Sequence, residues 1–152
     1  MVAPVTAVHA LLLPVGADLY ALPLDWAREV VAAPALTRLA TAPPLVVGLF
    51  NLRGQIVPLL DTAALLGLGR VETIEYAVVV TSAQGLAGLA ATGFPRRQTL
   101  DAPTGAAELP GTTGQYRVGS QVATLLDLAA LLSPEQVRDP GSRADLASAG
   151  DR

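Results

Sequence analysis

The chain has 152 residues, a net charge of −3 and 51% hydrophobic residues, which is enough apolar material for a small folded core. All ten basic residues are arginine and they form no basic stripe, which argues against nucleic-acid binding. The absence of lysine and cysteine excludes a lysine Schiff base, disulfides and thiolate chemistry. No apolar run reaches the roughly 18 residues of a membrane span, and the N-terminus lacks a signal peptide's basic region, so we expect a cytoplasmic protein without direct membrane insertion.

The first half of the chain is predicted to form short strands, because turn-forming glycine and proline recur throughout it. Two of the strands flank Arg53-Gly54 as a hairpin, since Gly54 can adopt a positive φ. Asp61 follows at the position of an N-cap, ahead of a short helix over residues 62–66 that Gly67 ends. The predicted strands cover residues 8–13, 18–24, 28–32, 46–52 and 55–60.

The second half repeats this plan, and the repeat is visible in the sequence itself. QIVPLLDTAALLG at residues 55–67 aligns with QVATLLDLAALLS at residues 121–133, so Asp127 takes the place of Asp61 before a second short helix. A strand–turn–strand unit with a capped helix, present twice, predicts a mostly β fold of two small barrels packed together, with short helices. The strands predicted in this half cover residues 76–80, 86–90, 97–100, 115–118 and 121–126.

The repeat places the boundary between the two barrels near residues 70–74. After the second barrel, a capping box that begins at Ser133, with Pro134 at the first helical position, predicts a further short helix. The rest of the C-terminal segment is small and polar, and we expect it to be disordered. The expected units are a first barrel over residues 8–70, a second barrel over residues 74–133, and the C-terminal segment over residues 134–152.

Few residues in the sequence can carry chemistry. His9 is the single histidine and stands on an apolar strand without acidic neighbours in the sequence, so we expect neither a metal site nor a catalytic histidine. One enzyme alternative is an aspartic-protease-like hydrolase, in which Asp61 and Asp127 would share a proton. Against it, Leu128 stands where that motif needs a hydroxyl residue, and the Ala-Ala-Leu-Leu after each Asp suits a capped helix. We therefore expect no catalytic residues, no cofactor and no hydrolase activity.

Arg53 is the candidate for partner contact. It lies among apolar residues at the tip or flank of the predicted hairpin, while the second repeat has Gly119 at the equivalent place. The barrel itself therefore does not require arginine there, although an exposed arginine in a turn is also common. A guanidinium offers five donors in a planar fork, which can bind a carboxylate or carbonyl groups of a partner or of the other barrel.

A set of motifs, most of them in the first repeat, resembles one known family. In type and spacing they closely resemble the CheW-like domain of chemotaxis coupling proteins and of the regulatory domains of their partner kinases. The resemblance implies two five-stranded barrels around a shared core, and a non-catalytic adaptor that couples chemoreceptors to a histidine kinase. Residues 89–97 of the second half depart from the family's usual pattern. The motifs are Tyr20-Ala21-Leu22-Pro23, Arg28-Glu29-Val30, Pro43, Gly48, Asn51-Leu52-Arg53-Gly54, Pro58, Asp61 and Leu65-Leu66-Gly67.

The same resemblance implies partners and a site. Family members bind the regulatory domain of a histidine kinase end to end through hydrophobic barrel surfaces, and they bind the cytoplasmic tip of a chemoreceptor in a groove between the barrels. Two alternatives stand beside the protease: the same adaptor in a pilus or twitching pathway, and a barrel protein with a purely structural role. By match to the motif, we predict partner binding by the hairpin residues Asn51, Leu52, Arg53, Gly54 and Val57.

Overall fold

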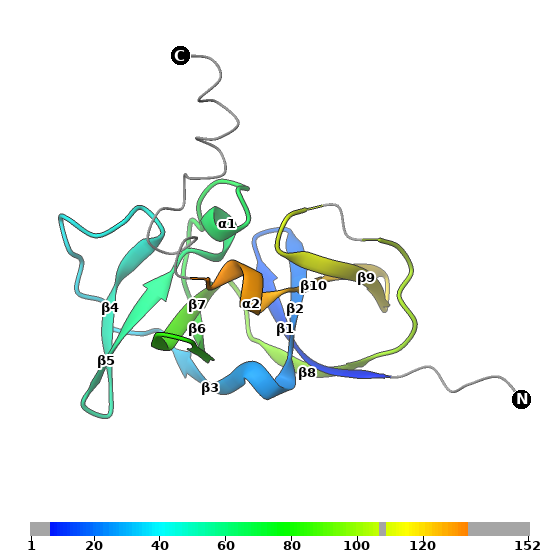
Figure 1. Ribbon diagram of the computed structural model, residues 1–152, viewed down its shortest axis with the longest axis horizontal. Coiled ribbons are helices and arrows are strands. Elements are labelled where there is room, and N and C mark those ends of the chain that lie inside the picture. Colours follow the sequence, from blue (N-terminus) through cyan, green and yellow to red (C-terminus); the bar gives the residue numbers. More distant parts are fainter. Residues whose placement is uncertain (1–6, 107–108, 134–152) are drawn as a thin grey trace, which may run out of the picture.

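The computed structural model describes residues 7–106 and 109–133 (Figure 1). The C-terminal helix and tail expected after residue 133 lie outside these residues. The described part contains ten strands, two short α-helices and one 3-10 helix, which confirms the predicted mostly β fold with short helices. None of the helices in this part of the chain has the length and hydrophobicity of a membrane span.

The strands lie close to the positions predicted from the sequence, with ends that differ by a few residues. The helices are the 3-10 helix η1 (Leu24–Trp26) and the α-helices α1 (Thr62–Leu65) and α2 (Leu128–Leu131). The strands are β1 (Val8–Val15), β2 (Asp18–Pro23), β3 (Ala27–Ala32), β4 (Val46–Leu52), β5 (Gln55–Leu60), β6 (Tyr76–Ser82), β7 (Gly85–Ala91), β8 (Arg96–Leu100), β9 (Thr112–Val118) and β10 (Gln121–Leu126).

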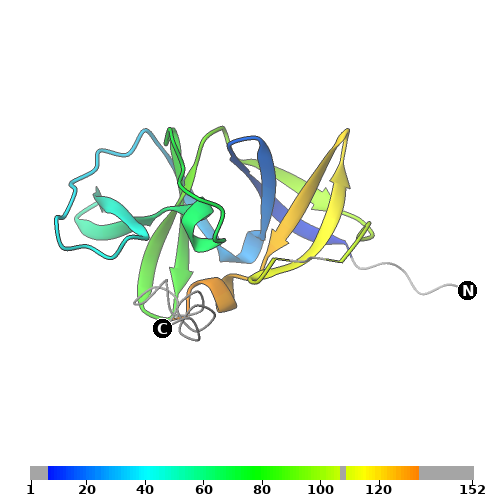
Figure 2. The same cartoon turned by 90° about the horizontal axis from the view of Figure 1, so that it is seen from above.

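These strands form two five-stranded sheets that lie side by side (Figures 1 and 2). Sheet A has the order β8-β1-β2-β10-β9, and sheet B has the order β3-β6-β7-β5-β4. Most neighbouring strands are antiparallel, but β10 runs parallel to β2 and β5 runs parallel to β7. The edge strands β8 and β9 of sheet A also contact each other, so this sheet is curved like an incomplete barrel.

The predicted boundary at residues 70–74 separates the two sequence repeats, but it does not separate the two sheets, so the two expected barrel ranges are corrected here. The first repeat gives β1 and β2 to sheet A, and its remaining three strands to sheet B. The second repeat does the reverse, with its first two strands in sheet B and the other three in sheet A. The physical reason is that η1 redirects the chain after β2, so β3 pairs with β6 from the other repeat.

The exchange of strands gives the two sheets a shared core. One cluster of buried side chains joins Leu13 and Leu22 of sheet A to Val78 and Leu89 of sheet B, together with residues of both α-helices. Two smaller clusters lie within the individual sheets, one around Leu12 and Leu100 and the other around Phe50 and Val79. The shared core holds the two sheets together, because separating them would expose this apolar surface to water.

Asp61 and Asp127 act as N-caps, as predicted. The carboxylate of Asp61 accepts a hydrogen bond from the Ala64 N–H at 3.0 Å, and that of Asp127 accepts one from the Ala130 N–H at 3.2 Å. Asp61 does more, because both of its carboxylate oxygens also accept from the Val71 N–H, at 3.0 and 3.2 Å. The first cap therefore ties the segment between the two repeats to α1.

Candidate partner-binding site

The loop between β4 and β5 is a tight two-residue turn. Leu52 and Gln55 are the last paired residues, which leaves Arg53 and Gly54 as the turn, with φ values of 50° and 87°. Two successive positive φ values are typical of a type I′ hairpin turn, which usually carries asparagine or glycine. The Asn51 side-chain oxygen accepts from the Gly54 N–H at 2.7 Å and supports the turn. Arg53 therefore occupies a position where most side chains are uncommon.

The Arg53 side chain reaches across sheet B to Glu29 on β3. Its Nη1 donates to Glu29 Oε2 at 3.0 Å, and its Nη2 donates to Glu29 Oε1. Strands β3 and β4 are the two opposite edges of sheet B, so this two-bonded ion pair spans the open side of the sheet. We call the Arg53–Glu29 pair the clasp, because it fixes the β4–β5 tip relative to β3.

The clasp is exposed to solvent and orients the hairpin more than it stabilises the fold. The side chains of Arg53 and Glu29 are 72% and 31% exposed, and exposed ion pairs contribute little to stability. The hydrogen bonds and charge of Arg53 lower the pKa of the Glu29 carboxyl, and the same contacts raise the pKa of the Arg53 guanidinium. The carboxyl is thus held in its charged form, ready to keep the arginine in one orientation.

Replacing Arg53 by glutamine is expected to raise the pKa of Glu29 toward the ordinary glutamate value of about 4.3. In the native protein the pKa of Glu29 is lowered, so the clasp is present above the ordinary glutamate pKa and is lost as pH falls through the lowered one. NMR titration of the side-chain carboxyl carbon measures both values. An identical Glu29 midpoint in the native protein and in Arg53→Gln would show that the clasp does not form in solution.

The structure separates the predicted site residues into two groups. Asn51, Arg53 and Gly54 are exposed at the hairpin tip, and Leu52 is half-buried beside them. Val57 is a correction, because it is fully buried in the core of sheet B and offers no surface to a partner. The reason is the two-residue pleat, which turns Val57 inward and its neighbour Ile56, 58% exposed, outward. Counting alternate residues back from the buried Leu59 would have identified Ile56 from the sequence.

Ile56 borders a groove over the parallel strands β5 and β7, which we call the hairpin groove. Its volume is about 320 Å³, and none of the described side chains that line it is charged. A second hollow of about 420 Å³ lies at the clasp and shares Gln55 and Leu86 with the hairpin groove. The tip and the groove therefore form one continuous surface. The groove is lined by Val46, Ile56, Pro58, Leu60, Leu86 and Leu132, among others.

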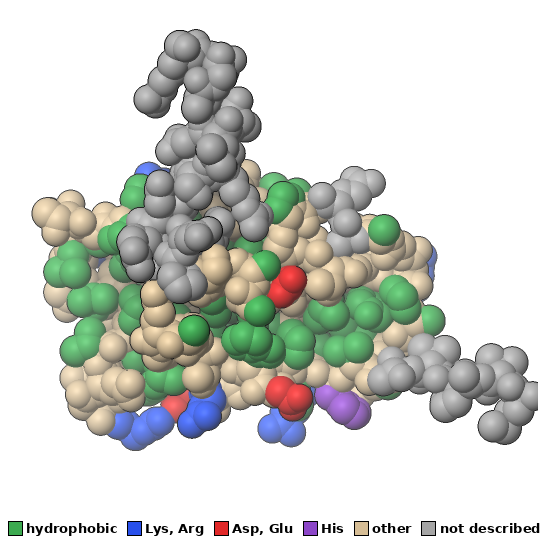
Figure 3. Space-filling view, viewed as in Figure 1, with side chains coloured by type: hydrophobic (Ala, Val, Ile, Leu, Met, Phe, Trp, Pro, Cys, Tyr) green, Lys and Arg blue, Asp and Glu red, His purple; other side chains and the backbone are tan. Residues whose placement is uncertain are grey.

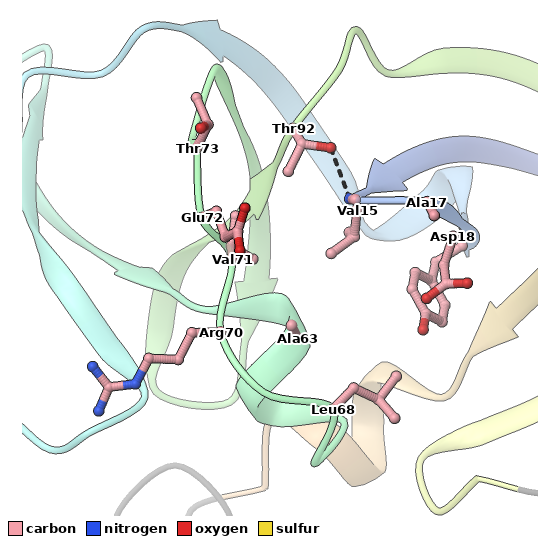
Figure 4. A pocket seen from close by; sticks show the side chains of 12 residues that line it. Val15, Ala17, Asp18, Ala63, Leu68, Arg70, Val71, Glu72, Thr73 and Thr92 are labelled. Atoms are coloured by element: carbon pink, nitrogen blue, oxygen red, sulfur yellow. Dashed lines mark hydrogen bonds between the residues drawn. The ribbon is translucent and has the colours of Figure 1, made fainter.

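A separate cavity of about 360 Å³ lies between the β1–β2 turn and the segment that follows α1 (Figure 4). Thr92 holds the turn in place, because its hydroxyl accepts from the Gly16 N–H at 2.9 Å. Tyr20 lines the cavity, and burial together with the charge of Asp18 raises the pKa of its hydroxyl. Within residues 7–106 and 109–133, no three His, Cys, Asp or Glu side chains come together as metal ligands.

Comparison with known proteins now decides the family. A family model described as the CheW-like domain matches residues 9–136, which is most of the chain. The chain belongs to the CheW-like domain family. A similar solved structure is the scaffolding protein TtCheW from Thermoanaerobacter tengcongensis, with a TM-score of 0.70 and 19% sequence identity over 84% of this chain and 94% of that chain. A search of curated proteins finds no match.

The family match confirms the resemblance seen in the sequence motifs. The likeness to TtCheW confirms the predicted fold, since the two chains share their architecture at low sequence identity. In this CheW-like protein the Asn51-Leu52-Arg53-Gly54 motif forms the tip of the β4–β5 hairpin. The Arg28-Glu29-Val30 motif supplies the other half of the clasp. Two motifs that are 24 residues apart in the sequence are therefore joined by one ion pair.

Proposed function

We propose that this CheW-like protein is a non-catalytic cytoplasmic adaptor that couples the tip of a chemoreceptor to the regulatory domain of a histidine kinase. The observation that carries the proposal is the uncharged hairpin groove, with Ile56 exposed at its rim and the clasp beside it. Membership of the CheW-like family supports the choice of partners. The adaptor would hold both partners at once and would perform no chemistry of its own.

The kinase regulatory domain is assigned to the hairpin groove. An exposed β-branched side chain beside an uncharged groove is costly to leave in water, and such surfaces are typical of protein–protein contacts. In the view of Figure 3, hydrophobic side chains are spread over the visible face, and charged side chains gather along its lower edge. Ile56 would enter the partner's apolar surface, and the clasp would form the polar rim. The receptor tip is assigned to a groove between the two sheets, as the family resemblance implies.

The protease alternative finds no support in the geometry of Asp61. A proton-sharing pair needs carboxylate oxygens that are free to face each other. Both oxygens of Asp61 instead accept hydrogen bonds from the backbone N–H of Val71, and one also accepts from that of Ala64. The pilus-pathway and purely structural alternatives are separated from the proposal by which partners bind.

The test is reconstitution with the kinase and receptor encoded beside this protein. Isothermal titration calorimetry with the isolated kinase regulatory domain and with a soluble receptor tip is expected to give binding to each. Autophosphorylation of the full kinase is expected to change only when kinase, receptor and this protein are all present. Binding to neither partner would contradict the proposal. Binding to a pilus-type kinase and receptor instead would assign the same role to that pathway.

Arg53→Ala is expected to weaken partner binding by about thirtyfold while shifting Tm by no more than about 2 °C. The alanine variant loses the clasp, so the hairpin tip is no longer held to β3, and it also loses the donors available to a partner. Calorimetry and thermal unfolding provide the two readouts, and Arg117→Ala on β9 is the matched control for an exposed strand arginine. A large fall in Tm would instead make Arg53 a structural strut.

A further inference from the structure

The internal repeat places a second groove in sheet A where sheet B has the hairpin groove. The second groove has a volume of about 430 Å³ and lies over the parallel strands β2 and β10. The hairpin groove lies over β5 and β7, the parallel pair of sheet B. Because β2 and β10 correspond to β7 and β5 in the repeat, the two grooves occupy equivalent positions. The second groove is lined by Asp18, Leu19, Tyr20, Leu68, Gln121 and Val122, among others.

The equivalence extends to individual side chains. The sequence repeat aligns Ile56 with Val122, and both are exposed, at 58% and 44%. The strand registers match as well, because Leu59 lies opposite Gly88 in sheet B, and its counterpart Leu125 lies opposite Ala21 in sheet A.

Counting back from these pairs aligns further residues of the two grooves. Two residues before Gly88 and Ala21, Leu86 of the hairpin groove matches Leu19 of the second groove. One residue further back, Gly85 matches Asp18. The two grooves thus share an apolar plan and differ by one carboxylate.

The Asp18 carboxylate has no basic partner in the described part of the chain, where the ion pair found is the clasp. The nearby Arg70 lines the adjoining cavity, but its guanidinium points away from Asp18 (Figure 4). The charge of Asp18 acts within a partly dry groove, because it adds to the effect of burial in raising the pKa of Tyr20. Leu68, 46% exposed, provides a further apolar contact beside this charge.

We propose that the second groove docks a partner segment that combines apolar side chains with one arginine or lysine placed opposite Asp18. The apolar side chains would cover Val122, Leu19 and Leu68, and the basic group would neutralise a carboxylate that otherwise loses water on docking. An acidic segment would be rejected, because it would place like charges together in the groove. The uncharged hairpin groove has no such requirement, so the two grooves would select different segments. This inference does not depend on the partners assigned to the hairpin groove.

A displayed library of random 12-residue peptides, selected on the immobilised full-length chain, tests the proposal. Peptides enriched on the native protein and lost on Val122→Ser are synthesised with a fluorescent label, and their Kd is measured by anisotropy. These peptides are expected to carry arginine or lysine among apolar residues. Asp18→Asn is expected to raise Kd at least about tenfold, and Asp18→Arg is expected to enrich acidic peptides instead. Ile56→Ser is the matched control in the hairpin groove and is expected to leave Kd unchanged.

Each possible result decides the question. Selection of no peptide that depends on Val122 would overturn the proposal, as would enrichment of peptides without basic residues or an unchanged Kd in Asp18→Asn. Thermal unfolding identifies any variant that fails to fold. Leu68→Ser, in the loop after α1 and outside the strands, then provides a second test of the apolar contact. It is expected to weaken the same peptides as Val122→Ser.

Discussion

Replacing Asp61 by alanine is expected to lower the free energy of unfolding by about 3 kcal/mol. Loss of an N-cap costs about 1 kcal/mol, and loss of a charge-assisted hydrogen bond adds about 2 kcal/mol. Asp61 makes both kinds of contact, because it caps α1 at Ala64 and binds the Val71 N–H with both oxygens. Its side chain is also buried, so water cannot readily replace it. Urea unfolding at neutral pH measures the loss.

Asp127→Ala is the matched control, because it removes the equivalent cap in the second repeat. Its carboxylate accepts from the Ala130 N–H, so the expected loss is about 1 kcal/mol. Equal losses in the two variants would show that the Val71 contact contributes nothing. Asp61→Asn also tests the enzyme alternative. Peptide cleavage at acid pH by the native protein, abolished in Asp61→Asn, would contradict a non-catalytic role.

The strands and caps could be predicted from the sequence because their signals are local. Gly54 and Gly67 mark a turn and a helix end, and both adopt positive φ. Asp61 and Asp127 announce two short helices through the residues that follow them. The exchange of strands between repeats could not be predicted in this way. Strand partners are chosen by contacts between distant residues, and the local pattern of β3 is the same whichever sheet it joins.

The candidate site was predicted in part, for a similar reason. Arg53 stood out because the second repeat has Gly119 in its place, and the structure puts it at the hairpin tip. Its partner Glu29 comes from the opposite edge of sheet B, a contact that no local spacing indicates. The error at Val57 has a different origin, because the motif match carried no information on the pleat. A strand residue contributes to a surface or to the core according to its phase alone.

The exposed position of Ile56 leads to the largest expected effect on binding. Ile56→Asp is expected to weaken binding of the kinase regulatory domain by at least about 100-fold, or about 2.7 kcal/mol. The apolar contact alone cannot account for this loss. The Ile56 side chain is already partly buried in the free protein, so its further burial is worth about 1 kcal/mol. Most of the effect comes from a carboxylate forced into an uncharged groove, which costs several kcal/mol when it finds no partner.

A graded series with matched controls isolates this effect. Ile56→Ala is expected to weaken kinase binding by about fivefold, which corresponds to loss of the apolar contact alone. Val122→Asp, at the equivalent place in sheet A, is expected to leave binding of the kinase domain unchanged. Tm is expected to fall little in all three variants, because each substitution lies at an exposed strand position. Calorimetry and thermal unfolding of each variant measure the two quantities. Unchanged kinase binding by Ile56→Asp would remove the hairpin groove as the docking surface, while the second groove would still be tested by its own peptides.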